Sequence, residues 1–186
     1  MQKLRRTIER YVPWDEREAA DRVLMLRAID ELEDPLFREN PIAHFTASAW
    51  IVNPPRDRVL MVWHNIYRTW SWTGGHADGE SDLLAVAMRE AREETGIQSI
   101  EPVIRGVYSV EVLPVIPHVK RGSFVSAHLH LNLTYLLQAD DAQQLRRKSD
   151  ENSGVAWLLL DEAADNKEEP FMAKVYGKLN SKLAGR

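Results

Sequence analysis

One stretch decides the fold: "GGHADGESDLLAVAMREAREETGI", which runs from Gly74 to Ile97. It opens with a glycine-rich turn and ends one residue past Gly96. Between these glycines it places three carboxylates close together, Glu90, Glu93 and Glu94. The arrangement needs an explanation, because like charges at neighbouring positions of a helix repel one another.

The stretch predicts a helix over 82–95. Ser81 is the expected N-cap, and Gly96 suits the left-handed position that often follows a helix end. One apolar stripe, with a spacing of three and four residues, is expected to dock on a sheet and consists of Leu84, Ala87, Met88 and Ala91. The three glutamates then converge beside this stripe.

A divalent cation would reverse the sign of the interaction among the glutamates. Like charges four residues apart cost about 0.2–0.5 kcal/mol in an isolated helix. Carboxylate oxygens suit Mg²⁺ or Mn²⁺, ions that often bridge protein carboxylates and substrate phosphates. The alternative is an acidic helix face in contact with solvent, and the three glutamates alone do not decide between the two.

The surroundings of the glutamates resemble the Nudix box, G-x5-E-x7-R-E-U-x-E-E-x-G-U, in which U is a bulky aliphatic residue. The run "REAREETGI" begins at Arg89, and Gly75 takes the first glycine position. Two positions depart from the pattern. Ser81 stands where the box has its first glutamate, with Glu80 one residue early, and Ala91 replaces a bulkier aliphatic.

The resemblance implies an α/β fold, a Nudix-type α/β/α sandwich with a mixed β-sheet, over residues 41–186. Residues 1–40 would form an N-terminal helical extension. The implied activity is hydrolysis of the pyrophosphate bond in a nucleoside diphosphate linked to another moiety, X, with Mg²⁺ or Mn²⁺ as cofactor. The partner is thus a small-molecule nucleotide derivative, and because Nudix proteins are often dimers, a homodimer is an option.

Metal ligands carried over from the family are the carbonyl of Gly75 and the carboxylates of Glu90, Glu93 and Glu94. Arg89 would orient these glutamates, with Asp82 or Glu93 as its partner in place of the displaced Glu80. The general base is either Glu90 or Glu151. Glu151 lies in the polar loop "SDENSGVAW" (Ser149–Trp157), where it is equally well explained as a turn residue.

Substrate contacts are expected from two segments. "RTWSWTGGH" places Arg68 and two tryptophans, Trp70 and Trp72, before the box, where a tryptophan could stack on a nucleobase or simply fill the core. His76 follows the double glycine. The insert from Glu111 to His130 holds further candidates for phosphate binding in a proline-containing loop, which are His118, Lys120 and Arg121.

Two histidines of the insert alternate on a predicted strand, so that His128 and His130 share one face. His128 and His130 are also candidates for substrate binding, and together with His118 they could form a second metal site. The commoner explanation for such a group is a set of hydrogen-bonded histidines that line a cleft.

In the rest of the chain, a first helix is predicted to end near Pro13, and two more are predicted over 15–33 and 168–183. A linker is predicted over 33–41. Strands are predicted over 44–52, 58–64, 102–114, 128–138 and 155–160. Alternating strands and helices are typical of a mixed sheet covered by helices.

Composition limits the alternatives. The chain has 186 residues, a net charge of −4 and no cysteine. It shows no signal peptide and no membrane-spanning run, so we expect a cytoplasmic protein with no membrane partner. The lack of cysteine argues against the isopentenyl diphosphate isomerase branch of this fold, and the acidic balance argues against RNA decapping or other nucleic-acid binding. A nucleotide-sensing Nudix domain without catalysis stays open.

Overall fold

The computed structural model describes residues 1–65, 68–120, 122–148 and 152–185. Its helices are α1 (Gln2–Arg10), α2 (Glu16–Glu31), α3 (Leu83–Thr95), α4 (Leu160–Ala164) and α5 (Pro170–Ala184). Its strands are β1 (Ala43–Val52), β2 (Arg58–His64), β3 (Thr69–Ser71), β4 (Thr73–His76), β5 (Glu101–Pro102), β6 (Ser109–Val115), β7 (His118–Lys120), β8 (Ser123–Val125), β9 (His128–Gln138) and β10 (Asn152–Leu159).

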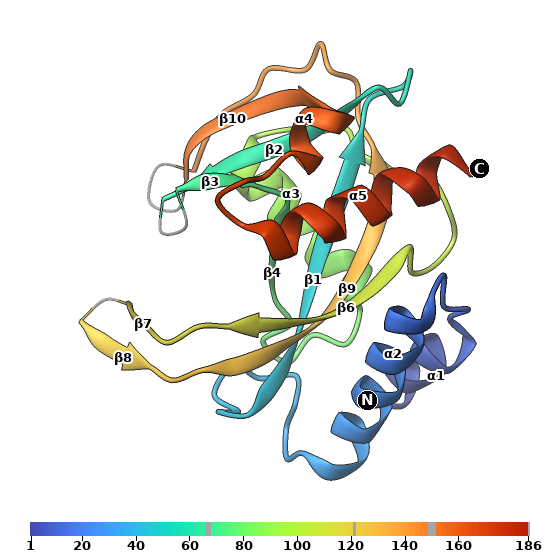
Figure 1. Cartoon of the computed structure of the whole chain (residues 1–186), viewed down its shortest axis with the longest axis vertical. Helices are drawn as coiled ribbons and strands as arrows, with labels where there is room; N and C mark the ends of the chain where they lie inside the picture. The colour runs from blue at the N-terminus through green and yellow to red at the C-terminus, as the bar shows by residue number, and fades with distance from the viewer. Residues whose placement is uncertain (66–67, 121, 149–151, 186) are drawn as a thin grey trace. The chain divides into compact units, whose positions relative to one another are not determined.

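Eight of the strands form one mixed sheet whose main path is β10-β2-β1-β9-β5 (Figure 1). β3, β4 and β6 pair with β2, β1 and β9, respectively. The chain divides into two compact units. The first unit contains residues 1–48, 75–86 and 106–135, and the second unit contains residues 49–74, 87–105 and 136–185. No helix in the described part of the chain is long and apolar enough to cross a membrane.

Most predicted elements are confirmed with small shifts at their ends, but the single strand predicted over 102–114 is wrong. The chain instead forms the two-residue β5 and, after a turn, β6. Gly106 lies in that turn at φ 100°, a conformation that interrupts a strand and that glycine adopts at little cost. The insert is also more regular than expected, because β7 and β8 form a hairpin where a loop was predicted.

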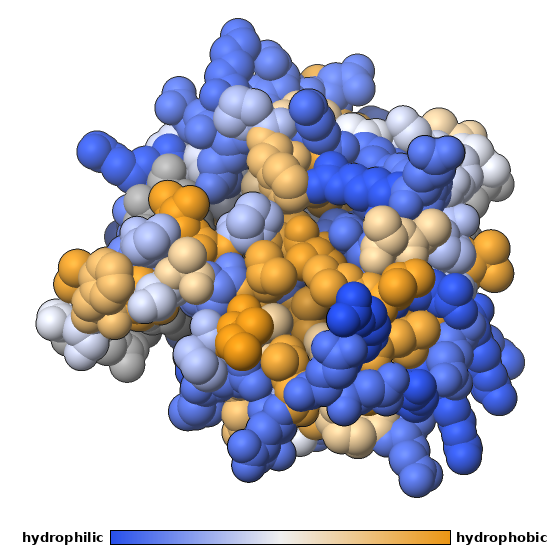
Figure 2. Space-filling model, turned by 60° about the horizontal axis from the view of Figure 1, so that its bottom comes forward, coloured by the Kyte–Doolittle hydropathy of each residue, from blue (hydrophilic) through white to orange (hydrophobic). Residues whose placement is uncertain are grey.

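The β7–β8 hairpin belongs to the first unit and carries apolar side chains in contact with solvent. Val119 and Phe124 of the hairpin, and Ile116 shortly before it, are each at least 66% exposed. Figure 2 shows this apolar surface at the left of the view. Exposure of this kind in a short hairpin is typical of a segment that contacts a ligand or another protein surface.

A buried polar row lies on one face of the sheet in the first unit. Because side chains alternate along a strand, His44, Thr46 and Ser48 of β1 share a face. Thr46 and Ser48 both donate hydrogen bonds to the Asn132 Oδ1 of β9, at 3.0 and 2.9 Å. Asn132 and Thr134 in turn donate to the buried carboxylate of Glu111 on β6, at 3.1 and 2.7 Å. Beyond His44, the polar groups of the row are therefore hydrogen-bonded to one another.

The N-terminal helices are attached to this unit through Glu18 of α2, which is fully buried. The Glu18 carboxylate accepts hydrogen bonds from the Ser109 hydroxyl at 2.7 Å, the Trp14 N–H at 2.7 Å and the Tyr11 hydroxyl. Burial, and then the contact with Glu18, raises the pKa of Tyr11, so its hydroxyl stays a donor. Residues 1–40 thus pack on β6, while the proposed domain boundary at residue 41 stays a prediction.

We expect Glu18→Ala to lower the free energy of unfolding by about 3 kcal/mol, because it leaves several buried donors without their acceptor. Urea unfolding followed by circular dichroism measures the change. Glu16→Ala is the matched control: Glu16 is exposed on the same helix, and its replacement should change stability by no more than about 0.5 kcal/mol. Equal effects of the two substitutions would contradict the role of Glu18.

In the second unit, β2 pairs with both β10 and β3. Tyr176 of α5 contacts Trp50 of β1. The Tyr176 ring stacks on Trp50 at a centroid distance of 5.2 Å. Its hydroxyl accepts a hydrogen bond from the Trp72 N–H at 3.3 Å. The ring of Trp50 and the backbone N–H of Trp72 thus both contact Tyr176 and hold α5 on the strands.

The start and the stripe of α3 differ from the prediction. Asp82, not Ser81, caps the helix, since its carboxylate accepts from the Ala85 N–H at 3.3 Å. The stripe is rotated as well. Its buried members are Leu83, Val86, Ala87 and Ala91, whereas Leu84 and Met88 are half-buried. The sequence pattern allowed both phases, because apolar residues occupy positions 83 to 88 almost without a break.

Gly96 ends α3 as predicted, with φ at 77°. A β-carbon at this position would lie 2.8 Å from the Arg146 β-carbon and 2.9 Å from its backbone nitrogen. The Arg146 N–H donates to the Thr95 carbonyl at 2.7 Å, which fixes the neighbouring chain. Both the backbone conformation and the close approach therefore require glycine.

We expect Gly96→Ala to lower the free energy of unfolding by about 2 kcal/mol, because a left-handed conformation is strained for alanine and the backbone of Arg146 is in the way. Gly177→Ala in α5 is the control, because it meets open space and glycine is a poor helix former. That substitution should raise stability by up to about 1 kcal/mol. Thermal and urea unfolding of both variants measure the difference, and loss of stability in both would refute the argument.

Candidate active site

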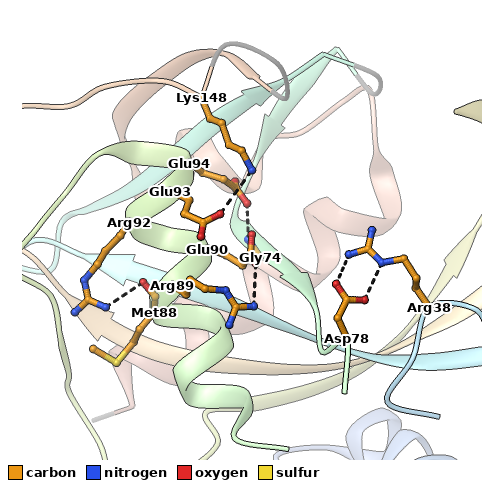
Figure 3. Close-up of polar contacts among 10 residues, drawn as sticks. All are labelled: Arg38, Gly74, Asp78, Met88, Arg89, Glu90, Arg92, Glu93, Glu94 and Lys148. Atoms are coloured by element: carbon orange, nitrogen blue, oxygen red, sulfur yellow. Dashed lines mark hydrogen bonds and ion pairs between the residues drawn. The ribbon is translucent and has the colours of Figure 1, made fainter. Parts of the chain in front are cut away.

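The packing of α3 gives its three glutamates different environments, although all three lie within its last two turns (Figure 3). Ala91 is fully buried, and Glu94 follows it one turn later on the same face with only 7% exposure. The Glu90 side chain is 16% exposed and the Glu93 side chain 47%. The carboxylates thus form a graded series from buried to solvent-exposed.

Each carboxylate has a nearby donor within the second unit. The Gly74 N–H donates to Glu94 Oε1 at 3.3 Å, and Lys148 Nζ lies 3.7 Å from Glu93 Oε2. Arg89 Nη2 donates to Glu90 Oε1 at 3.3 Å. In addition, the buried side chain of Asn152 donates to the Glu94 carbonyl at 3.2 Å, which ties the start of β10 to the end of α3.

The charge on Glu90 is not fully compensated by these contacts. Burial, and then the neighbouring Glu93 carboxylate, raises the pKa of Glu90, while Arg89 opposes the shift. Half-buried carboxylate oxygens with excess negative charge are a donor set that suits a hard divalent cation such as Mg²⁺ or Mn²⁺. The residues present therefore fit the metal that the box implies.

In the presence of a chelator at pH 7, we expect Glu90→Gln to raise the free energy of unfolding by about 0.5 kcal/mol, because it removes a like charge from the helix. The pKa of Glu90 is higher in the folded protein than in the unfolded chain. Ionisation of Glu90 therefore destabilises the folded protein once the pH rises above the pKa of the unfolded chain. The gain should accordingly disappear at pH 4. Glu93→Gln is the control and should have a smaller effect at pH 7, because the Glu93 side chain is 47% exposed and water screens its charge better than that of Glu90, which is 16% exposed. Urea unfolding measures both, and a loss of stability in Glu90→Gln would contradict the raised pKa.

The displaced box glutamate has another role in the first unit. Glu80 Oε1 accepts from the Asp82 N–H at 2.7 Å, and Asp82 in turn pairs with Lys3 at 2.8 Å. The expectation that Asp82 or Glu93 would pair with Arg89 is therefore wrong, because each has a different cation beside it. The partner of Arg89 is Glu90.

Several predicted site residues stay predictions. Gly75 belongs to the first unit. Its role as a metal ligand through its carbonyl is inferred from the box alone. Glu151 and Arg121, and the side chain of Lys120, lie outside the described residues.

Two predicted contacts for substrate lie in the second unit, close in sequence to Gly74. Arg68 is exposed at the end of the turn between β2 and β3 and has a positive φ of 55°. Trp72 is half-buried, with its ring edge-on to Tyr176 at 5.5 Å. Trp70 contacts Trp63 edge-on, also at 5.5 Å. The tryptophans thus help pack the unit.

The first unit gathers four histidine rings. His44 lies at the centre, with ring centroids 5.1 Å from His76, 4.9 Å from His128 and 4.9 Å from His130. Burial, and to a lesser degree His128 and Arg38, lowers the pKa of His44, against the opposing effect of the Asn40 carbonyl. Nearby, Arg38 Nε donates to Asp78 at 2.7 Å (Figure 3).

The predicted trio of His118, His128 and His130 is therefore not the group that the structure assembles. His118 lies on β7, where its Nδ1 contacts the Ile116 carbonyl at 3.0 Å, and His44 and His76 join the other two instead. His44 was missed. A usable signal was present in "HFTAS" (His44–Ser48), whose alternation of polar and apolar residues matches that of "HLHLNLT" (His128–Thr134).

The NUDIX domain model matches residues 43–179. A C. elegans Ap4A hydrolase, solved as a binary complex, has 18% sequence identity and a TM-score of 0.55, over 76% of this chain and 99% of that one. The E. coli dihydroneopterin triphosphate pyrophosphohydrolase has 16% identity and a TM-score of 0.54, over 72% and 92%. A Nudix-family hydrolase from Clostridium perfringens has 18% identity and a TM-score of 0.53, over 75% and 97%. No curated protein sequence matches this chain.

The chain therefore belongs to the Nudix hydrolase family. The match to the domain covers most of its length, and the solved structures share its mixed sheet and covering helices, the Nudix α/β/α sandwich. The helices α1 and α2 precede the matched region as an N-terminal addition.

Proposed function

We propose that this chain hydrolyses the pyrophosphate bond of a nucleoside diphosphate linked to another moiety, with Mg²⁺ or Mn²⁺ as cofactor. The observation that carries the proposal is the carboxylate series on α3. Glu94 is buried, Glu90 is half-buried with a raised pKa, and Glu93 is exposed beside them. A structural helix gains nothing from collecting three like charges in this way, whereas a site for a cation does.

Glu90, Glu93 and Glu94 would hold the metal through their carboxylate oxygens. When bound, a divalent ion neutralises phosphate charge and lowers the pKa of a coordinated water. The chain itself holds the ligands in place: the Gly74 N–H orients Glu94, and Arg89 orients Glu90. Glu90 is a candidate general base, since its carboxyl already has a raised affinity for a proton. Glu151 is the second candidate and Gly75 a further ligand, both from the resemblance to the box.

Substrate selectivity is assigned to two regions. In the second unit, Arg68 is exposed and free to meet a phosphate, and the half-buried Trp72 is a candidate for stacking on a nucleobase. In the first unit, His118 on β7 is a candidate for phosphate binding, and Lys120 and Arg121 stay candidates from the sequence alone. A cytoplasmic location and a homodimer stay predictions from the sequence and the family.

The test is phosphate release from a panel of substrates in the presence of a coupling phosphatase and Mg²⁺ or Mn²⁺. The panel includes dinucleoside polyphosphates and nucleoside triphosphates, because the structural neighbours are an Ap4A hydrolase and a dihydroneopterin triphosphate pyrophosphohydrolase. Nucleotide sugars, dinucleotide cofactors and coenzyme A derivatives complete it. We expect turnover of one substrate class that depends on the metal.

Glu93→Gln and Glu94→Gln should each reduce kcat by about 100-fold or more, because each removes a charged ligand from the site. Glu101→Gln is the matched control, since it removes the same charge from an exposed position on β5 and should leave turnover unchanged. Tight nucleotide binding with no turnover anywhere on the panel would instead support the alternative, a nucleotide sensor. Equal turnover by wild type and both variants would exclude the proposed role of the carboxylates.

A further inference from the structure

The proposed hydrolysis gives the four-histidine group of the first unit no metal-binding role. Its central ring, His44, lies near the start of β1 and is only 2% exposed. Backbone hydrogen bonds place neighbours on both sides: the Leu129 N–H donates to the Ile42 carbonyl, and the Ala77 N–H donates to the Phe45 carbonyl, each at 3.0 Å. Three separate parts of the chain therefore deliver imidazoles to one place.

The hydrogen-bonding pattern selects one tautomer of His44. Its Nδ1 lies 3.3 Å from the Asn40 carbonyl oxygen, which can only accept, so Nδ1 carries the hydrogen. The lone pair is then on Nε2. This atom is buried, and within the described part of the chain it has no hydrogen-bond partner. A buried acceptor nitrogen is costly to leave without a donor or a metal.

This pattern is the one that metal-binding histidines show. A ligating imidazole usually donates its other N–H to a carbonyl or carboxylate, which fixes the ring and raises its basicity. His128 repeats the pattern, because its Nδ1 lies 2.8 Å from the Ser126 carbonyl. The Asn40 carbonyl is itself held in a turn, in which the Asn40 side chain accepts from the Ile42 N–H at 3.0 Å.

Distances within the group also suit a metal. One ring nitrogen from each of His44, His76 and His130 lies within 4.8 Å of the other two. Three nitrogens bound to one zinc ion at about 2.0–2.1 Å lie about 3.4 Å apart, so small side-chain rotations suffice. His76 and His130 are half-buried, which leaves the group accessible from one side.

We propose that His44, His76 and His130 bind a divalent transition metal of the zinc class, in a site built from nitrogen donors and independent of the α3 carboxylates. Neutral imidazole suits Zn²⁺ and its neighbours in the first transition row, whereas Mg²⁺ prefers oxygen ligands and keeps much of its water. His128, 4.9 Å from His44, stands beside the site as a fourth imidazole. The proposal does not rest on the hydrolase activity.

The first measurement is a calorimetric titration of chelator-treated full-length protein with Zn²⁺, and separately with Mg²⁺. To remove the carboxylate ligands from consideration, the same titration is run on the double variant Glu93→Gln/Glu94→Gln. We expect one tight Zn²⁺ site per chain in both proteins and no competition from Mg²⁺ at that site. Loss of the tight site in the carboxylate double variant, or no tight Zn²⁺ binding by wild type, would overturn the proposal.

Histidine variants then locate the site. His44→Gln, His76→Gln and His130→Gln should each weaken Zn²⁺ binding by more than about 100-fold, since the loss of a ligand costs more than the loss of an outer hydrogen bond. His118→Gln is the matched control and should bind Zn²⁺ as wild type does. Wild-type affinity in all three ligand variants would refute the assignment.

A measurement on wild type alone covers the case in which a buried-histidine variant does not fold. X-ray absorption of the Zn²⁺-loaded protein reports the number of imidazole ligands from their characteristic scattering. At least three imidazoles are expected. A zinc environment made mainly of carboxylate oxygen and water would exclude the site.

Discussion

The candidate site depends on how α3 is packed through Ala87 and Ala91. Both alanines are fully buried, and side chains this small let the helix backbone approach its neighbours closely. The next residue on that face, Glu94, is carried out of solvent, while Glu90 is left half-buried and Glu93 exposed. Three identical side chains thereby acquire different electrostatic properties, which is how a folded chain assigns different chemical tasks to residues of one type. Ala91 departs from the bulky aliphatic of the box and is fully buried.

The first unit differs from the second in that one buried face of its sheet is polar. Sheet faces that pack under helices are usually apolar, and buried polar groups are tolerated only when they are hydrogen-bonded. Here Thr46, Ser48, Asn132 and Thr134 satisfy one another and the buried Glu111. Glu18 adds the same kind of link from α2. Such a network specifies one register of the strands, because a shift by one residue would leave its members without partners.

The histidine group continues this polar row at its His44 end. The hydroxyls and amides of the row hydrogen-bond to one another. At its end, by contrast, the lone pair of His44 Nε2 has no hydrogen-bond donor in the described part of the chain and is available to a metal ion. The two units thus offer different chemistry. The second unit presents carboxylate oxygens that favour hard ions, and the first unit presents nitrogens that favour softer ones. A chain with both kinds of donor can distinguish two metals by chemistry alone.

The sequence by itself determined the helix that carries the glutamates, its end at Gly96 and the family, because these depend on local spacing: helical periodicity, a glycine that takes a left-handed conformation, and a short run of ordered residue types. It also determined most strands from their alternation. It did not determine which phase of the apolar run on α3 is buried, since residues 83 to 88 allow two.

Only the tertiary structure decided the partners. Asp82, which the sequence offered as a partner for Arg89, pairs instead with Lys3, a residue 79 positions away. His44, and not His118, lies beside His130, because backbone hydrogen bonds place β1 next to β9. Contacts between residues far apart in the chain depend on strand order and register, and no local pattern in a single sequence records them.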